Sequence, residues 1–471
     1  MQKTKIIATL GPACQTKDVV RQMLLDGLDV MRINMSHAQE LFHIKKQIKM
    51  IRAEAKKLNQ NISIMMDLGG PKIRVKLNSP VSSIPIIAGA TYTLGRNNCD
   101  ININKKLSFQ NIQKDARIKI DDGSINFSVD KISEQHLTLK ALNDGTITNH
   151  KGVNFPGIAL QMPAVTIQDK QNILHAIDLE VDWIAQSFVR SAKDILPIKR
   201  ILNNHNINIP IVAKIEKPEA IDNLDSIINQ YDGILIARGD LGVEMNLSVL
   251  PKLQKHIINH CIYNKKPCIV ATQMLESMIT HATPTRAEVN DVANAIYDGV
   301  DAVMLSAETA TGAYPNKAVS MMAKIAQSIE SDLDLSNFNR NIIDALSQSI
   351  DDNYLAICHA AYSISTTLDI RVIVVLTDSG KTAIQMAQFR PNATIVAITP
   401  FKTVCNQLAM IWGIIPIHQK QPSDINRLYK SVNNILLKRK LLYKQDNFIL
   451  TSGTLKNIPH STNMLQIYQA K

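Results

Sequence analysis

The chain has 471 residues, of which 45% are hydrophobic and 20% are charged, a composition typical of a folded protein of about three domains. Its apolar runs are far shorter than the roughly 20 residues that a membrane-spanning helix needs, its six cysteines are scattered and form no C-x-x-C pair, and no export signal follows the first residues, so we expect a soluble cytoplasmic protein. The net charge of +11 is spread over short lysine and arginine runs and aromatic residues make up only 4%, which argues against a nucleic-acid-binding protein.

Short β-like runs recur along the chain, and each is followed by a stretch with helical periodicity. After Pro218, for example, Ile221, Leu224, Ile227 and Ile228 form one apolar helix face. Repeated alternation of strand and helix predicts a parallel sheet that closes into a (β/α)8 TIM barrel. The eight runs lie at residues 5–10, 30–35, 62–67, 183–189, 209–216, 233–237, 268–272 and 302–305.

The alternation is interrupted after the third run. Short alternating segments at 90–94, 117–120, 125–129 and 137–142 are separated by turn residues such as those at 143–145, a pattern typical of β-hairpins. They predict a small inserted β-barrel at residues 71–166, on the face of the TIM barrel where catalysis occurs. The inserted domain could act as a lid over the active site, or it could be an addition with no role in catalysis; both are compatible with this position.

A further α/β region follows the barrel. Its β-like runs lie at 371–376, 394–399 and 448–450, after a polar stretch at 331–340. We therefore expect a barrel built from residues 1–70 and 167–340, an inserted lid at 71–166, and a C-terminal α/β domain at 345–471.

Two neighbouring barrel strands end in charged residues. Lys214 and Glu216 are two residues apart on one strand, so their side chains point to the same side, and Asp240 follows the next strand beside Gly239. Mg²⁺ prefers oxygen ligands and usually takes one or two carboxylates. Glu216 and Asp240 therefore form a candidate site for Mg²⁺, or for Mn²⁺, although each residue alone could be part of a structural salt bridge.

Other strand ends carry groups suited to phosphate. Arginine offers a planar fork for phosphate oxygens, which makes Arg32 and Arg74 candidate clamps, although each alone could equally be structural. The remaining polar residues at the same rim are Asn34, Ser36, His37, Asp67 and Thr272.

A possible anion site follows the strand predicted at 371–376. The segment TDSGKT at 377–382 precedes a helical stretch, where helix-start NH groups, hydroxyls and a lysine can converge on a phosphate. An ordinary capped helix is the alternative. The candidate residues are Thr377, Ser379, Gly380, Lys381 and Thr382.

Taken together, several long motifs in order strongly resemble those of pyruvate kinase. They are KIIATLGP at 5–12, MRINMSH at 31–37, KIE at 214–216, ARGDLGV at 237–243, ATQM at 271–274, PTRAE at 284–288 and DAVMLSAE at 301–308. The resemblance covers nearly the whole chain, including the inserted lid.

The resemblance implies transfer of the phosphoryl group of phosphoenolpyruvate to ADP, which yields pyruvate and ATP in the last step of glycolysis. It implies that Lys214 stabilises the transferring phosphoryl group and the enolate and that Arg32 clamps the phosphoryl group. Gly239, Asp240 and Thr272 would contact the substrate, and Glu216 and Asp240 would hold Mg²⁺. The nucleotide contacts it implies are Asn34, Ser36, His37, Arg74 and Lys151.

One segment departs from the family's pattern. Many members read DTKGPEIR where this chain reads DLGGPKIR at 67–74. The family's potassium ion is surrounded by residues matching Asn34, Ser36 and Asp67, but Leu68 offers no side-chain oxygen and Lys72 replaces an acid. We expect that K⁺ is not required and that the Lys72 ammonium takes its place. A solvated surface lysine at the lid hinge is the alternative.

The resemblance also implies a homotetramer and a phosphorylated effector bound at 377–382. The segment SGTLK at 452–456 is similar to that of bacterial members that respond to AMP or a sugar monophosphate. Two other functions stay open at this point: a related barrel that uses phosphoenolpyruvate or pyruvate with another acceptor, and a basic regulatory or RNA-binding protein that has kept the fold.

Overall fold

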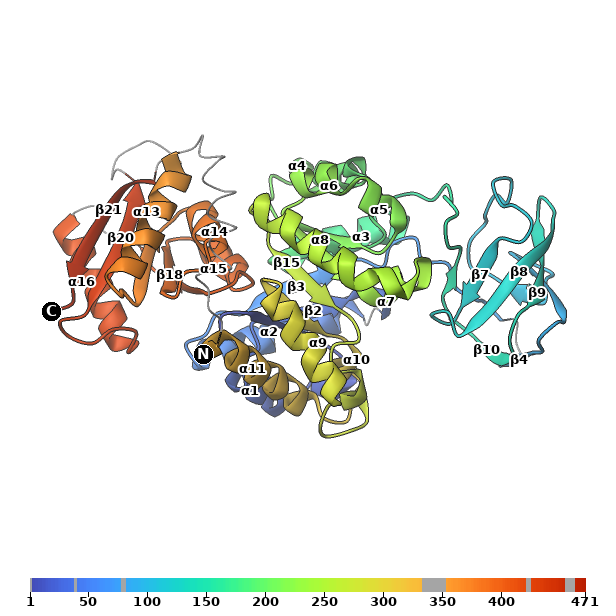
Figure 1. Ribbon diagram of the computed structural model, residues 1–471, viewed down its shortest axis with the longest axis horizontal. Helices are drawn as coiled ribbons and strands as arrows, with labels where there is room; N and C mark the ends of the chain where they lie inside the picture. The colour runs from blue at the N-terminus through green and yellow to red at the C-terminus, as the bar shows by residue number, and fades with distance from the viewer. Residues whose placement is uncertain (1, 38–39, 78–81, 333–352, 421–424, 454–461) are drawn as a thin grey trace.

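A computed structural model describes residues 2–37, 40–77, 82–332, 353–420, 425–453 and 462–471. Three bodies follow one another along the long axis of the molecule, with the barrel between the lid and the C-terminal domain (Figure 1). Within the described ranges, no helix combines the length and apolar character that a membrane span requires. The fold class expected from the sequence is confirmed: a TIM barrel, an inserted β domain and a C-terminal α/β domain.

The central body is a closed barrel of eight parallel strands in the order β1-β16-β15-β14-β13-β12-β3-β2. Most of its strand residues are fully buried, because helices cover the outside while side chains fill the inside. The strands are β1 (Lys5–Thr9), β2 (Val30–Asn34), β3 (Ser63–Asp67), β12 (Trp183–Gln186), β13 (Ile211–Ile215), β14 (Gly233–Ala237), β15 (Cys268–Ala271) and β16 (Ala302–Leu305).

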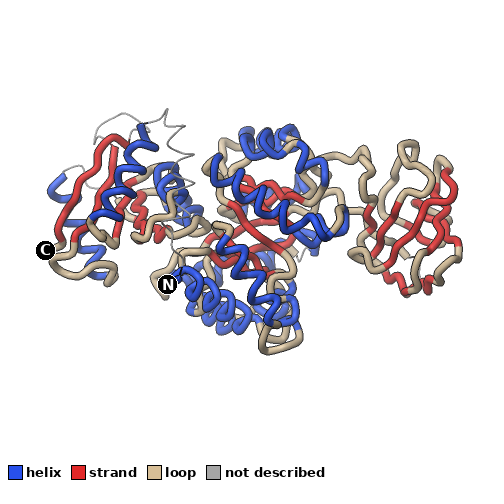
Figure 2. Tube along the Cα trace, in the orientation of Figure 1, coloured by secondary structure: helices blue, strands red, loops and turns tan. Residues whose placement is uncertain are grey.

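Helices surround this barrel (Figure 2). The apolar face expected after Pro218 is divided between α5 and α6, which meet at Asn223. The α-helices of the barrel are α1 (Lys17–Leu25), α2 (Leu41–Lys57), α3 (Ile167–Asp178), α4 (Leu196–Asn204), α5 (Pro218–Asp222), α6 (Leu224–Gln230), α7 (Arg238–Glu244), α8 (Leu250–Tyr263), α9 (Arg286–Tyr297), α10 (Ala307–Ala310) and α11 (Pro315–Asp332).

The inserted domain, called the lid below after the role expected for it, is all-β and follows β3. Its strands form a six-stranded sheet, β11-β7-β8-β9-β5-β6, and a two-stranded sheet, β10-β4. A separate hydrophobic cluster, which includes Phe127, Leu139 and Phe155, fills its interior. The strands are β4 (Ser83–Ile86), β5 (Thr91–Gly95), β6 (Ile101–Asn102), β7 (Arg117–Ile120), β8 (Ile125–Ile132), β9 (His136–Ala141), β10 (Gly145–Thr148) and β11 (Val153–Asn154).

The C-terminal domain contains a five-stranded sheet in the order β19-β18-β17-β20-β21, in which only β21 is antiparallel to its neighbour. Helices pack against this sheet (Figure 2). The elements are α13 (Asn353–Thr367), β17 (Val372–Leu376), α14 (Lys381–Gln388), β18 (Thr394–Thr399), α15 (Lys402–Leu408), β19 (Ile414–His418), α16 (Ile425–Lys438), β20 (Asn447–Gly453) and β21 (Thr462–Gln469).

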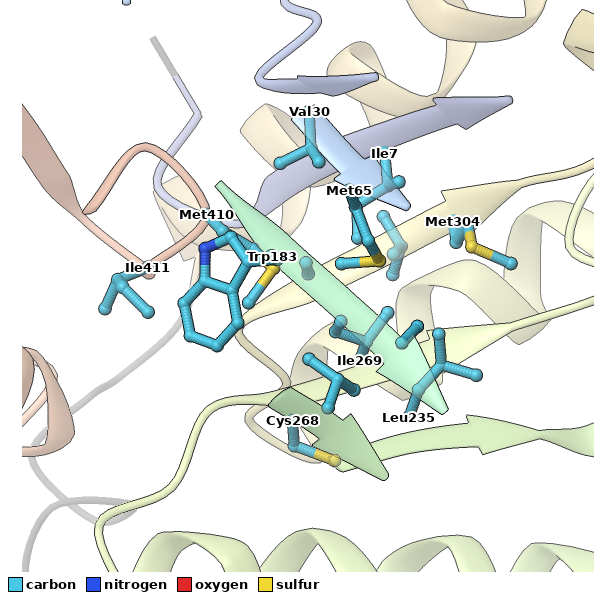
Figure 3. Packing of buried hydrophobic residues seen from close by; sticks show 14 of the residues in the cluster. Ile7, Val30, Met65, Trp183, Leu235, Cys268, Ile269, Met304, Met410 and Ile411 are labelled. Atoms are coloured by element: carbon cyan, nitrogen blue, oxygen red, sulfur yellow. The ribbon is translucent and has the colours of Figure 1, made fainter. Parts of the chain in front are cut away.

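The C-terminal domain packs against the N-terminal ends of the barrel strands. Trp183, the first residue of β12, lies beside Met410 and Ile411 (Figure 3), and its indole Nε1 donates to the Gln407 carbonyl at 3.1 Å. Arg390 is 1% exposed and pairs with Asp301 of the barrel at 3.1 Å. The C-terminal domain therefore shares a continuous core with the barrel.

Candidate active site

Three of the charged residues singled out in the sequence meet at the mouth of the barrel. Lys214 belongs to β13, Glu216 follows that strand, and Asp67 ends β3. The Lys214 Nζ atom lies 2.8 Å from Glu216 Oε1 and 3.2 Å from Asp67 Oδ1. All three residues are buried. The C-terminal ends of the strands thus hold an ammonium group between two carboxylates.

Arg32 of β2 extends this charged cluster. Its Nε and Nη2 atoms both lie 2.7 Å from Asp67 Oδ2, and its Nη1 donates to the Thr9 hydroxyl at 2.9 Å. Asp67 is therefore paired with two cations at once. These two cations already balance the negative charge of Asp67, which was expected to be one of the residues around the potassium ion.

Burial and neighbouring charges act in opposite directions on these groups. Burial favours neutral Lys214, but Asp67 and Glu216 outweigh it and raise the pKa of Lys214 above its ordinary value. Burial also favours neutral Asp67, yet Lys214 and Arg32 hold the pKa of Asp67 below its ordinary value. For Glu216, burial prevails over Lys214 and raises the pKa. A further cation beside Glu216 would stabilise its charged form.

Thr272 follows β15 in a strained backbone conformation. Its φ is 72°, which is rare for a β-branched residue and persists where the surrounding structure imposes it. The Thr272 hydroxyl accepts a hydrogen bond from the Gly239 NH at 2.8 Å and donates one to the Ala271 carbonyl. A Cβ atom on Gly239 would lie 3.3 Å from that hydroxyl, so glycine allows this close approach.

Lys72 connects the start of the lid to the next strand end. Its Nζ atom lies 3.2 Å from Asp240 Oδ1, and each of the two side chains is about one quarter exposed. Gly70, two residues earlier, has a φ of 66°, and a Cβ there would lie 2.8 Å from the Phe188 ring. Lys72 is thus held beside the barrel rim rather than in solvent.

Glu216 and Asp240 provide a donor set that fits Mg²⁺. Both are hard carboxylates, they follow the neighbouring strands β13 and β14, and each has an ammonium group beside it. Within the described residues, no group of three or more His, Cys, Asp or Glu side chains could hold a metal. A site with two carboxylates leaves positions for water and substrate oxygens, as Mg²⁺ prefers.

The residues expected to contact the nucleotide are not all gathered at this rim. The Asn34 side chain accepts a hydrogen bond from the Ser36 NH at 3.1 Å, and the His37 side chain lies outside the described part of the structure. Arg74 donates to the His150 carbonyl at 3.0 Å, and Lys151 pairs with Asp121 at 2.8 Å. Both of these contacts lie within the lid.

Three residues of the cluster were missed in the sequence. The Ser187 hydroxyl accepts a hydrogen bond from Lys214 Nζ at 2.9 Å, the Phe188 NH donates to Glu216 Oε2 at 2.8 Å, and Thr9 contacts Arg32. Each lies at or just beyond the C-terminal end of a barrel strand. The predicted barrel already placed these residues at strand ends, where active sites of such barrels lie, so their position could have identified them.

The segment at 377–382 begins α14. Gly380 caps the helix with a φ of 82°, and its NH donates to the Thr377 hydroxyl at 2.9 Å. The Thr382 hydroxyl lies 2.7 Å from that of Thr462 and is buried. Ser379 and Lys381 are exposed and remain the side chains available to an anion. Residues 454–456 lie outside the described residues.

Comparisons with known proteins agree with this architecture. Residues 1–319 match the family described as "Pyruvate kinase, barrel domain", and residues 355–468 match "Pyruvate kinase, alpha/beta domain". Pyruvate kinase 2 of Synechocystis sp. is 38% identical over 100% of this chain and 80% of its own length. The pyruvate kinase of Clostridium acetobutylicum is 36% identical over 99% of each chain.

A solved structure is similar along the whole chain as well. The crystal structure of a pyruvate kinase from Cryptosporidium parvum superposes with a TM-score of 0.93 at 30% sequence identity. The similarity covers 100% of this chain and 96% of the other.

Proposed function

The chain belongs to the pyruvate kinase family, and we propose that the charged barrel mouth around Lys214 is where it transfers a phosphoryl group from phosphoenolpyruvate to ADP. The observation that carries this proposal is the buried Lys214 ammonium, held between Asp67 and Glu216 at 3.2 and 2.8 Å. Phosphoryl transfer depends mostly on positioning and on neutralising charge, and this mouth concentrates fixed charges in a water-poor site.

The reaction breaks one P–O bond and forms another. The bond between phosphorus and the enol oxygen of phosphoenolpyruvate breaks, and a terminal β-phosphate oxygen of ADP bonds to phosphorus. The enolate that leaves takes up a proton at carbon and becomes pyruvate. ADP, phosphoenolpyruvate and one proton are therefore consumed, and ATP and pyruvate are formed.

Lys214 and Arg32 supply the positive charge for this step. Lys214 stays an ammonium because its carboxylate neighbours raise its pKa, so it can stabilise the enolate oxygen and the phosphoryl group. Arg32 is fixed by Asp67 and Thr9 and orients the phosphoryl oxygens. Gly239 and Thr272, joined by a hydrogen bond, contact the substrate.

Glu216 and Asp240 are the residues that would hold the divalent ion, Mg²⁺ or Mn²⁺. When bound, such an ion neutralises charge on the substrate oxygens and orients them. Burial and the neighbouring acids Asp240 and Asp67 raise the pKa of Glu216 in spite of Lys214, so a divalent cation there would stabilise its charged form.

Lys72 takes the place of a monovalent cation. Its ammonium is tethered 3.2 Å from Asp240, and Asp67 is already paired with Arg32 and Lys214. Leu68 offers no side-chain oxygen to an ion. A tethered charge also avoids the entropy cost of recruiting a free ion. Catalysis therefore needs no K⁺.

The lid contributes to nucleotide binding through Arg74 and Lys151. Both side chains contact lid groups, so they reach ADP when the lid and the barrel mouth face one another. Asn34, Ser36 and His37 contribute from the barrel side. Such a division makes ADP binding sensitive to the angle of the lid.

We also propose two further properties, an effector site and a homotetramer, which similarity to the family supports. A phosphorylated effector, AMP or a sugar monophosphate, binds at the start of α14, where Ser379 and Lys381 are exposed. The assembly is a homotetramer. Apolar side chains suited to contacts between copies are exposed at Leu247 and, on the edge strand β21, at Ile467, which are 69% and 45% exposed.

The direct test of the proposed function is a reconstituted assay. The purified protein is mixed with phosphoenolpyruvate, ADP and Mg²⁺, and pyruvate and ATP are measured over time. We expect both products in equal amounts and none when ADP or Mg²⁺ is omitted. Pyruvate formed without ATP, or with another acceptor, would overturn the proposal.

A further inference from the structure

Two lid strands contact the barrel at one short helix, α7. Lys119 of β7 donates from Nζ to the Val243 carbonyl at 2.7 Å. Asn154 of β11 donates from Nδ2 to Glu244 Oε1 at 2.8 Å. Both contacts lie at the C-terminal end of α7, whose first turn carries Asp240. The lid is therefore joined to the same helix that presents a proposed metal ligand.

Glu244 is the buried centre of this contact. It is 6% exposed, and its Oε1 atom also accepts a hydrogen bond from Lys217 Nζ at 2.6 Å. Its Oε2 atom has no hydrogen-bond partner within the part of the chain that the structure describes. A buried, incompletely satisfied ion pair contributes little net stability, but it can select one arrangement over others.

The two segments that connect the lid to the barrel both contact α7 at the barrel rim. Asn154 lies in the last lid strand, where the chain returns toward the barrel, and Lys72 lies in the segment that enters the lid. Both of these hinge segments contact α7, Asn154 through Glu244 and Lys72 through Asp240. Since α7 spans only seven residues, or roughly 10 Å, the two contacts hold both hinge segments to the same short rigid element.

We propose that Glu244 is a positioning residue that anchors the lid to α7 and sets the angle at which Arg74 and Lys151 meet ADP. This inference rests on the proposed function. Glu244 itself touches no reacting group. Loss of the anchor should weaken ADP binding and lower turnover, because small misplacements of positioning groups reduce rates strongly. Phosphoenolpyruvate binding, which depends on the barrel mouth, should be nearly unchanged.

The test changes the hydrogen bond between the Asn154 amide and the Glu244 carboxylate. Asn154→Asp places a second carboxylate against Glu244, and we expect KM for ADP to rise roughly tenfold with little change in KM for phosphoenolpyruvate. Adding Glu244→Gln restores a pair of one amide and one carboxylate, so KM for ADP in the double variant should return toward the wild-type value. Asn154→Ala, which removes the lid donor without adding charge, should show a smaller change in the same direction.

A second measurement does not depend on catalysis. Hydrogen exchange of the backbone at 71–77 and 150–158 reports whether the hinge is released, and we expect faster exchange in Asn154→Asp and in Asn154→Ala. Glu54→Gln is the matched control, because Glu54 is also buried and pairs with Lys57 at 2.6 Å, but on α2. This control should leave KM for ADP and hinge exchange as in the wild type.

The inference is overturned if the Asn154 variants change neither KM for ADP nor hinge exchange. It is also overturned if KM for both substrates rises equally, because the contact would then act on the fold as a whole. Failure of the proposed function is distinguishable: the wild type would form no pyruvate and ATP, while hinge exchange would still report on the contact.

Discussion

The two ends of the barrel meet their neighbouring domains in different ways. At the N-terminal ends of the strands, Trp183 and the buried Arg390–Asp301 pair join the C-terminal domain to the barrel core. At the C-terminal ends, Lys119, Asn154 and Lys72 connect the lid through polar contacts, and the lid interior is a separate hydrophobic cluster.

This difference suggests that the contact with the C-terminal domain serves stability and that the contact with the lid serves function. Moving the C-terminal domain away from the barrel would expose apolar surface of a shared core, which is unfavourable. Changing the angle of the lid exposes little apolar surface because its core moves with it. We therefore expect the apolar end to hold the architecture and the polar contacts at the charged end to let the lid angle change during the proposed reaction.

The largest expected effect is on stability at the apolar end. Arg390→Met should destabilise the protein by about 3–5 kcal/mol, because Asp301 is left buried without its cation. The thermal midpoint measures this loss, and Asp301→Asn in the same chain should recover part of it. An unchanged midpoint in the single variant would contradict the assigned role of this pair.

The next effect is on catalysis at the charged end. Lys214→Met should lower turnover by at least about a hundredfold, because a preorganised cation contributes on the order of 3 kcal/mol to transition-state stabilisation. Phosphoenolpyruvate should still bind. Lys199→Met, which changes a half-buried lysine of α4 on the outside of the barrel, is the matched control. Near-normal turnover in Lys214→Met would remove this residue from the mechanism.

A smaller effect concerns pH at the apolar end. Burial raises the pKa of Asp182 to about 6, although Arg52 and the Ile64 NH act against it. The folded state therefore holds this proton more tightly than the unfolded state, so stability falls as pH rises from about 4 to 6 and then levels off.

Asp182→Asn should remove this dependence. Relative to the wild type, the variant should gain about 2–3 kcal/mol between pH 4 and pH 7. Thermal midpoints of the two proteins at several pH values measure the difference. Parallel curves across this range would show that Asp182 does not titrate as described.

The smallest expected effect connects the C-terminal domain to the active site. At low phosphoenolpyruvate, AMP or a sugar monophosphate should raise the apparent substrate affinity about fivefold, near the lower limit of typical allosteric coupling. The Ser379→Ala and Lys381→Ala double variant should lose the response but keep basal activity. A response unchanged by these substitutions would exclude the start of α14 as the effector site.

Much of the fold was predictable because barrel strands are buried on both faces. The strands at 233–237 and 302–305 are found where the apolar runs indicated. The C-terminal strands β19 and β21 were missed. β19 contains Pro416 and β21 lies at the sheet edge, and both positions weaken the apolar pattern on which strand prediction relies.

The site was predictable where strand periodicity determined it. Lys214 and Glu216, two residues apart, lie together as expected. The contact between Lys72 and Asp240 joins residues 168 positions apart, and no local pattern encodes such a contact. The strained backbone at Thr272 is also imposed by its surroundings, so propensity could not reveal it.

The most direct test of the account is pyruvate formation in buffers that contain only tetramethylammonium as the monovalent cation, compared with K⁺. We predict equal rates for the wild type in both buffers, because Lys72 supplies the charge beside Asp240. Lys72→Glu should lose activity in tetramethylammonium and regain part of it on adding K⁺. If wild-type activity collapses without K⁺ and returns when K⁺ is added, Lys72 does not act as the cation.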